Sequence, residues 1–444
     1  MVRISIIGTG YVGLTTAVCF ASRGYRVIAS TKNEENVRTL NTGRAPFYEP
    51  GLDEALAHSI KSKHLRAEIS RAKAVSETDV SFITVGTPDQ PDGKIDLRYI
   101  VSASEDIGRA LRDKNGYHVV VVKSTVTPGT TRDVVKQALE KTSDLAAGLD
   151  FGLCMNPEFL RQGSAIEDTL HPDRVVVGEY DKRSGKVLEE LLNDFYEHSV
   201  PILKMGLESA EMVKYASNSF LATKISYANE MANVCERVPG VDVSKVMAGV
   251  GLDHRITPQF LNAGAGFGGS CLPKDVKALC KFAEACGYNA LLLRAVLAIN
   301  DAQVRRVVQL ALKILGKPEG KKVALLGLAF KPNTDDLREA PSLKIAKALI
   351  TAGVNVSAFD PVVKKIALPE FDALECADSI WACLVGAHCC VVVTEWEQFK
   401  VLTPDDFINH MARPAVVDAR RIFDPRQFRE RLTFIAVGLG NDFV

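Results

Sequence analysis

A run of glycines that ends in a cysteine, residues 266–275, contains the residue types that could do covalent chemistry. It reads Gly-Phe-Gly-Gly-Ser-Cys-Leu-Pro-Lys-Asp. The glycines permit sharp turns and a close approach of the backbone to a ligand, and Pro273 suits the first turn of a helix. Apolar residues recur at helical spacing from residue 276 to residue 286, so Cys271 is predicted to stand just before a helix N-terminus.

That position favours a reactive thiol. Unpaired N–H groups and the helix dipole stabilise an anion there, which supports a thiolate nucleophile at Cys271. Asp275 follows one helical turn later on the same side, within reach of whatever the sulfur attacks. The alternative is that Cys271 is a small buried hydrophobic residue, the usual fate of a cysteine outside a disulfide. The flanking glycines and the Pro-Lys-Asp sequence favour the nucleophile.

A glycine fingerprint at the start of the chain predicts a dinucleotide site. The apolar run 4–7 is followed by Gly-Thr-Gly-Tyr-Val-Gly at residues 8–13 and by a helical stretch at 14–22. In the order strand, turn and helix, this spacing places a helix N-terminus against a pyrophosphate. The second strand, residues 25–30, ends in Thr31 and Lys32, where such folds usually carry an acid for the adenosine ribose. The hydroxyl could bind the ribose of NAD, or with the lysine it could receive the 2′-phosphate of NADP.

Composition and length exclude several classes of protein. The 444 residues include 54 basic and 54 acidic side chains, so no global field recruits nucleic acid or an anionic membrane. The chain has too many residues for one core, and no apolar run is long enough to span a bilayer. The ten cysteines are scattered, which favours neither a zinc site nor a disulfide framework and suggests a cytoplasmic protein. Because an apolar strand is predicted directly after residue 3, we expect no signal peptide.

The remaining pattern predicts an α/β fold made of two Rossmann-like doubly wound domains joined by a central helical connector. Buried strands are expected at 80–85, 119–122 and 151–155, long helices at 207–237 and 290–315, and a second strand–helix–strand unit at 321–328, 343–352 and 354–360. We expect domains at 1–200, 201–315 and 316–444. The long helices favour a homodimer, and the tail 441–444 is expected to be loose.

Taken together, these motifs resemble the UDP-glucose/GDP-mannose dehydrogenase family. The likeness rests on the Cys271 segment and on Glu211, Lys214 and Asn218 of the long helix, and it runs from Ile4 to about Arg421. The resemblance implies an NAD-dependent four-electron oxidation at C6 of a nucleotide sugar, with UDP-glucose favoured over GDP-mannose or a UDP-N-acetylhexosamine. Two other hypotheses are a single-step NAD(P)-dependent alcohol dehydrogenase and a nucleotide-binding regulator without catalysis. The family carries Asp and Lys where this chain has Thr31 and Asn36, yet the resemblance still favours NAD.

The resemblance also implies roles for individual residues, and it implies no metal. Cys271 would trap the aldehyde, Lys214 and Asn218 would stabilise the oxyanion, Asp275 and Thr125 would hold a water, and Glu158 would act as the base in thioester hydrolysis. The cofactor-binding residues that it implies are Gly8, Gly10, Tyr11, Val12, Gly13, Thr31, Lys32, Thr87, Thr125, Glu158, Lys274 and Arg338. The substrate-binding residues, of which Arg255 would reach the site of a neighbouring subunit, are Glu158, Phe159, Leu160, Lys214, Asn218, Arg255, Phe260, Leu261, Gly264, Gly268, Lys331 and Arg420.

Overall fold

The computed structural model describes residues 2–366 and 368–440, so the tail that was expected to be loose lies outside the described residues. Backbone contacts divide the chain into two units, Met1–Ser217 and Asn218–Val444. The expected three-part division of the chain stays a prediction.

The first unit is built on an eight-stranded sheet with the order β3-β2-β1-β4-β5-β6-β7-β8. Neighbouring strands are parallel except β6 and β7, which run antiparallel. Strands buried on both faces read as continuous apolar runs, as the four valines of β5 do. The strands are β1 (Arg3–Ile7), β2 (Arg26–Ser30), β3 (Leu65–Glu68), β4 (Val80–Ile83), β5 (Val119–Val122), β6 (Gly152–Met155), β7 (Val175–Glu179) and β8 (Ile202–Gly206).

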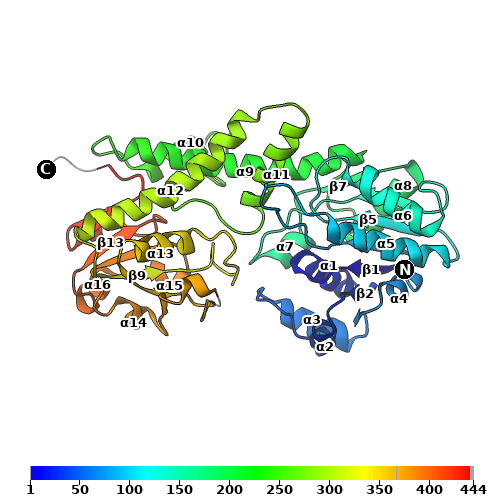
Figure 1. The fold of residues 1–444 in the computed structure, drawn as a ribbon, viewed down its shortest axis with the longest axis horizontal. Coiled ribbons are helices and arrows are strands. Elements are labelled where there is room, and N and C mark those ends of the chain that lie inside the picture. The colour runs from blue at the N-terminus through cyan, green and yellow to red at the C-terminus, as the bar shows by residue number, and fades with distance from the viewer. Residues whose placement is uncertain (1, 367, 441–444) are drawn as a thin grey trace. The chain divides into compact units, whose positions relative to one another are not determined.

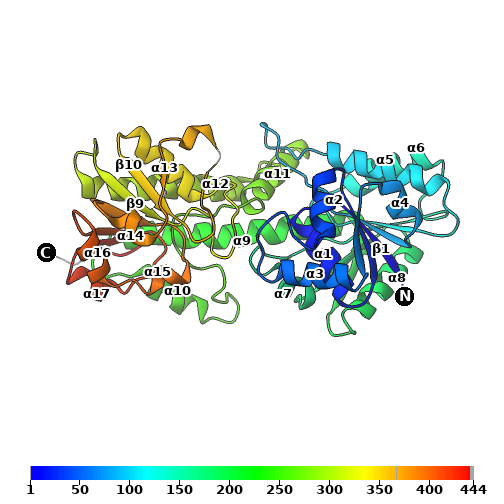
Figure 2. The same ribbon diagram turned by 90° about the horizontal axis from the view of Figure 1, so that it is seen from below.

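Helices cover both faces of this sheet. Figure 2 shows α1 and α3 on one side of β1 and α4, α5 and α6 on the other. Side chains of α1, α3 and α8 share one buried cluster with β1, β2 and β4. The helices are α1 (Tyr11–Ser22), α2 (Glu34–Asn41), α3 (Leu52–Lys61), α4 (Arg71–Ser76), α5 (Arg98–Arg112), the π-helical turn η1 (Thr131–Val135), α6 (Lys136–Ser143), α7 (Ala165–Leu170) and α8 (Lys182–Phe195).

The second unit contains a six-stranded, fully parallel sheet with the order β11-β10-β9-β12-β13-β14. Counted from β9, this is the same 3-2-1-4-5-6 order that the first six strands of the chain have, which is the doubly wound arrangement. The expected fold class is therefore confirmed. The strands are β9 (Lys322–Leu326), β10 (Asn355–Phe359), β11 (Glu375–Cys376), β12 (Cys389–Val392), β13 (Ala415–Asp418) and β14 (Thr433–Ala436).

Two long helices stand out in the green and yellow part of the ribbon (Figure 1). Helix α9 (Leu207–Cys235) begins in the first unit and ends in the second, and α12 (Leu291–Leu315) belongs to the second. Within the described ranges, no helix combines the length and apolarity needed to cross a bilayer. The other helices of this unit are α10 (Val243–Gly251), α11 (Leu272–Ala285), α13 (Pro341–Thr351), the 3₁₀ turn η2 (Pro369–Phe371), α14 (Ile380–Leu384), α15 (Glu397–Lys400), α16 (Pro404–His410) and α17 (Pro425–Arg429).

Candidate active site

The glycine fingerprint forms the turn between β1 and α1, and its glycines have different functions. A Cβ on Gly13 would lie 1.9 Å from the carbonyl oxygen of Gly8, so only glycine lets α1 pack this closely on the strand end. Gly8 has φ +113°, a conformation that other residues rarely adopt. A Cβ on Gly10 would meet nothing within 4 Å, and no side chain caps α1 there. The space at Gly10 and the uncapped helix N-terminus fit a pyrophosphate.

These two environments predict opposite outcomes for two alanine substitutions. Gly13→Ala should lower the free energy of unfolding by about 3 kcal/mol, because the added methyl overlaps backbone. Gly10→Ala should leave stability within about 0.5 kcal/mol and weaken NAD binding, because its methyl occupies the approach to the pyrophosphate. Urea denaturation and NAD titration of both variants measure these effects. Equal stability of the two variants would contradict the packing role of Gly13.

Tyr11 and Val12 open helix α1, and Tyr11 is fixed by its neighbours. Its ring stacks on Phe47, with the ring centroids 4.8 Å apart, and its hydroxyl accepts a hydrogen bond of 3.1 Å from the backbone N–H of Gly163. Glu49, in the turn before α3, accepts from the same N–H at 2.6 Å. The turn at residues 46–52 thus holds the start of α1 and the segment after β6 together.

Thr87 and Thr125 follow β4 and β5 at the carboxyl edge of the sheet, where α/β proteins bind ligands. The hydroxyl of Thr87 donates to the carbonyl oxygen of Thr125 at 2.8 Å. Glu211, fully buried on α9, accepts from the backbone N–H groups of Gly129 at 2.6 Å and Thr131 at 2.8 Å. Burial raises the pKa of the Glu211 carboxyl to about 7. The loop that carries Thr125 is therefore tied to the helix that carries Lys214.

Glu158 and Lys214 form a nearly fully buried ion pair. The Lys214 Nζ lies 2.9 Å from Oε1 of Glu158, and the second oxygen of Glu158 accepts from the backbone N–H of Leu160 at 2.8 Å. The Phe159 ring has the Lys214 ammonium 5.5 Å and the Arg174 guanidinium 4.1 Å from its centroid. Four residues that the sequence suggested, at positions 158, 159, 160 and 214, thus meet in one place.

Lys123 is a member of this cluster to which the sequence analysis gave no function. It directly follows β5, and its Nζ donates to Oδ1 of Asn156 at 2.9 Å. Burial lowers the pKa of Lys123 to about 8, against the opposing effect of the Glu158 carboxylate. The available signal was a lysine at the carboxyl end of a fully buried strand, two residues before Thr125. Such a lysine loses its proton at a lower pH than an exposed lysine does.

In the second unit, Asp275 is buried between two polar partners. The amide Nδ2 of Asn218 donates to its Oδ2 at 2.6 Å, and the Lys274 ammonium lies 2.6 Å from its Oδ1. The backbone N–H of Asp275 donates to the carbonyl of Cys271 at 2.8 Å. Asp275 thus stands one helical turn after Cys271, as the spacing predicted.

Cys271 is the N-cap residue of α11 and is exposed, so the alternative of a buried hydrophobic cysteine is wrong. Its sulfur lies 3.6 Å from the hydroxyl of Ser270. The preceding glycines are required by close packing, since a Cβ on Gly268 would lie 2.5 Å from the carbonyl oxygen of Glu339. The pKa of Arg338 is raised chiefly by its hydrogen bond to Asp336, and its backbone carbonyl accepts from the N–H of Gly269 at 2.9 Å.

The other predicted substrate residues lie in the second unit. A Cβ on Gly264 would come within 3.3 Å of the Arg420 guanidinium, so these two positions adjoin. Leu261 is buried, and Phe260 has φ +64°. Arg255 is exposed and pairs with Asp253 at 2.6 Å, and the ammonium of Lys331 lies 5.8 Å from the Phe330 ring centroid. The proposed contacts of these residues with substrate stay predictions.

The two doubly wound sheets and the dinucleotide turn are those of an NAD-dependent oxidoreductase. The chain belongs to the UDP-glucose/GDP-mannose dehydrogenase family: residues 2–198 match its NAD binding domain, 208–302 its central domain and 324–425 its UDP binding domain.

Similar proteins cover nearly the whole chain. The UDP-glucose 6-dehydrogenase TuaD of Bacillus subtilis is 41% identical over 95% of this chain and 90% of its own length. The UDP-glucose 6-dehydrogenase of Pseudomonas aeruginosa is 41% identical over 99% of this chain and 97% of its own length. The solved UDP-glucose dehydrogenase of Pyrobaculum islandicum is 40% identical with a TM-score of 0.90, and covers 99% of this chain and 98% of that chain.

Proposed function

We propose that this protein oxidises UDP-glucose at C6 to UDP-glucuronate. Two hydrides leave the same carbon, each to one molecule of NAD, and water supplies the second oxygen of the acid. The observation that carries the proposal is the arrangement of groups along α9. Lys214, paired with Glu158, and Asn218, bonded to Asp275, stand one helical turn apart on this helix.

In the first oxidation, NAD held by the turn at residues 8–13 would serve as the hydride acceptor for C6, and the C6 hydroxyl loses its proton. A water held by Asp275 and Thr125 takes that proton. The Lys214 ammonium and the second N–H of the Asn218 amide donate to the oxygen as negative charge develops on it. Each such donor contributes about 3 kcal/mol to stabilising the transition state in comparable sites.

In the second oxidation, the carbon is held covalently. The Cys271 sulfur attacks the aldehyde and forms a C–S bond, and the oxygen takes a proton to give a thiohemiacetal. Loss of the second hydride from this carbon, together with the hydroxyl proton, leaves a thioester. A water activated by Glu158 then attacks the thioester, the C–S bond breaks, and the acid leaves with the thiol restored. The aldehyde never has to be released.

UDP-glucose is favoured over other nucleotide sugars by the names of the relatives and by the match to a UDP binding domain. A GDP-mannose 6-dehydrogenase of Azotobacter vinelandii is 42% identical over 82% of this chain. The preference for the nucleotide base and for the sugar of the substrate should therefore both be measured. We expect NADH formation with UDP-glucose at kcat/KM at least tenfold above that with GDP-mannose or UDP-N-acetylmannosamine. A preference for either of the latter would overturn the assignment.

We also propose a cytoplasmic homodimer. The support for a cytoplasmic location is the scattered set of ten cysteines in the sequence. The support for the dimer is an apolar stripe on α9: Phe220, Tyr227 and Val234 recur every seven residues, and each side chain is at least half exposed. Such a stripe on a long helix fits packing against a second copy.

A further inference from the structure

The carboxyl end of β2 adjoins a group of charges that we call the basic cluster: Lys32, Arg71, Asp106 and Arg109. The Asp106 carboxylate of α5 lies 3.0 Å from the Lys32 ammonium. It also lies 2.8 Å from the Arg71 guanidinium, at the start of α4, and 2.6 Å from that of Arg109. Three cations surround one carboxylate, which leaves an excess of two positive charges.

The carboxylate of Glu68 does not cancel this excess. Glu68, at the end of β3, is matched by Lys73 at 2.8 Å. Burial by itself would raise the pKa of Asp106, but the hydrogen bonds from Arg109, Lys32 and Arg71 outweigh it and hold that pKa below its ordinary value. Asp106 therefore stays ionised near neutral pH, and the cluster keeps its net positive charge.

Two buried polar atoms at this place lack a hydrogen-bond partner among the described residues. They are the Nε of Arg71, whose side chain is only 10% exposed, and the hydroxyl of Ser30, the fully buried last residue of β2. A buried donor left without an acceptor destabilises the folded state, and more so when it is charged. An anion with several acceptor oxygens would supply what Arg71 lacks.

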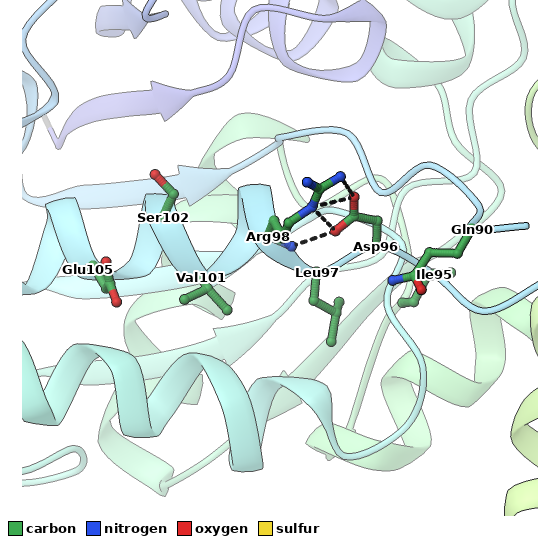
Figure 3. A pocket seen from close by; sticks show the side chains of 8 residues that line it. All are labelled: Gln90, Ile95, Asp96, Leu97, Arg98, Val101, Ser102 and Glu105. Carbon is green, nitrogen blue, oxygen red and sulfur yellow. Dashed lines mark hydrogen bonds and ion pairs between the residues drawn. The ribbon is translucent and has the colours of Figure 1, made fainter.

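A pocket of about 520 Å³ adjoins the basic cluster. Figure 3 shows Val101, Ser102 and Glu105 of α5 along it, with Ile95 and Leu97 from the preceding loop. The hydroxyl of Ser102, which lines the pocket, accepts a hydrogen bond of 2.9 Å from Lys32 of the cluster. Apolar walls with a few polar groups suit a flat ring such as adenine.

We propose that the basic cluster, with the hydroxyl of Thr31, binds the 2′-phosphate of NADP, so that this protein uses NADP as well as NAD. In doubly wound folds an acid at the end of the second strand binds the 2′-hydroxyl of NAD, and an arginine nearby accommodates the 2′-phosphate of NADP. This chain has Thr31 in place of that acid, so no carboxylate at that position repels the phosphate. Guanidinium groups pair with phosphate through two parallel hydrogen bonds.

The most direct test compares two ligands that differ by the 2′-phosphate alone. Calorimetric titration of the full chain with 2′,5′-ADP and with 5′-AMP measures the contribution of that group. We expect 2′,5′-ADP to bind at least tenfold more tightly, which corresponds to about 1.4 kcal/mol. Equal or weaker binding of 2′,5′-ADP would overturn the proposal.

Variants separate recognition of the phosphate from a merely structural ion pair. Lys32→Met should remove most of the tenfold preference for 2′,5′-ADP, whereas Asp106→Asn, which removes the competing carboxylate, should increase it several-fold. Lys141→Met on α6 makes the same change of charge and should leave the preference intact. If the cluster had only a structural role, Lys32→Met and Asp106→Asn would each weaken the binding of 2′,5′-ADP and of 5′-AMP to the same extent. A preference unchanged in Lys32→Met would rule the cluster out.

Turnover with UDP-glucose supplies a second readout, and this arm alone rests on the proposed function. We expect kcat/KM with NADP to be within about tenfold of that with NAD, because the cluster binds the 2′-phosphate while the ribose keeps its own contacts. Inactivity with both cofactors would count against the proposed function, and the ligand comparison would still decide this inference. Activity with NAD and none with NADP would contradict the inference itself.

Discussion

Cys271→Ala is expected to abolish formation of the acid while both nucleotides still bind with affinities within a few-fold of wild type. The thiol is the nucleophile of the proposed covalent step, and loss of a nucleophile typically lowers kcat by about 10⁴-fold or more. The side chain is exposed at the N-terminus of α11, so its truncation leaves no cavity and should not unfold the protein. Product analysis by chromatography, with calorimetric titration of NAD and UDP, measures both effects.

Cys286 provides a matched control. It is the C-cap residue of the same helix, and it is also exposed. Cys286→Ala should retain wild-type acid production, because its thiol is at the opposite end of α11 from the proposed reaction. Wild-type rates in Cys271→Ala would remove the covalent step from the mechanism, even if UDP-glucose proved to be the substrate.

Lys214→Met is expected to have two separable effects. Removal of an oxyanion donor should lower kcat by about 10²- to 10³-fold. It also leaves Glu158, which is only 8% exposed, without its cation, and breaking a buried pair costs about 3–5 kcal/mol of stability. Steady-state kinetics and urea denaturation measure the two effects independently.

A double variant distinguishes these effects. Glu158→Gln combined with Lys214→Met removes both charges, so most of the lost stability should return. The activity should stay low, because the oxyanion donor and the proposed base are both missing. Lys224→Met serves as a control on the same helix, since that lysine donates to the carbonyl of Ile256 at 3.0 Å and has no place in the reaction. Near-normal kcat in the double variant would contradict the role of Lys214.

Features that depend on neighbouring residues in the chain could be predicted from the sequence. The turn at residues 8–13 and the helix that starts after Cys271 are of this kind, because glycine, proline and apolar spacing determine them locally. The long helix was predicted as residues 207–237 and extends over Leu207–Cys235. The short edge strands β3 and β11 carried no such signal, because edge positions tolerate the charged residues that interrupt an apolar run.

Partners that lie far apart in sequence could not be predicted in this way. Glu211 reaches residues about eighty positions earlier, and Asp106 meets Lys32 across more than seventy, so only the folded chain shows that they interact. The sequence indicated the chemistry of Lys214 and Asn218 only through family resemblance. The sequence did not indicate that Glu158 pairs with Lys214 or that Asp275 accepts a hydrogen bond from Asn218.

The central claim is that one carbon loses four electrons in two steps, the second of them while it is bound to Cys271. Its most direct test is the ratio of NADH formed to sugar consumed, measured together with an aldehyde-trapping reagent in the same reaction. We predict two NADH for each UDP-glucuronate and no trapped aldehyde. One NADH for each sugar, with free aldehyde in the trap, would show that the reaction stops after a single oxidation and would contradict the account.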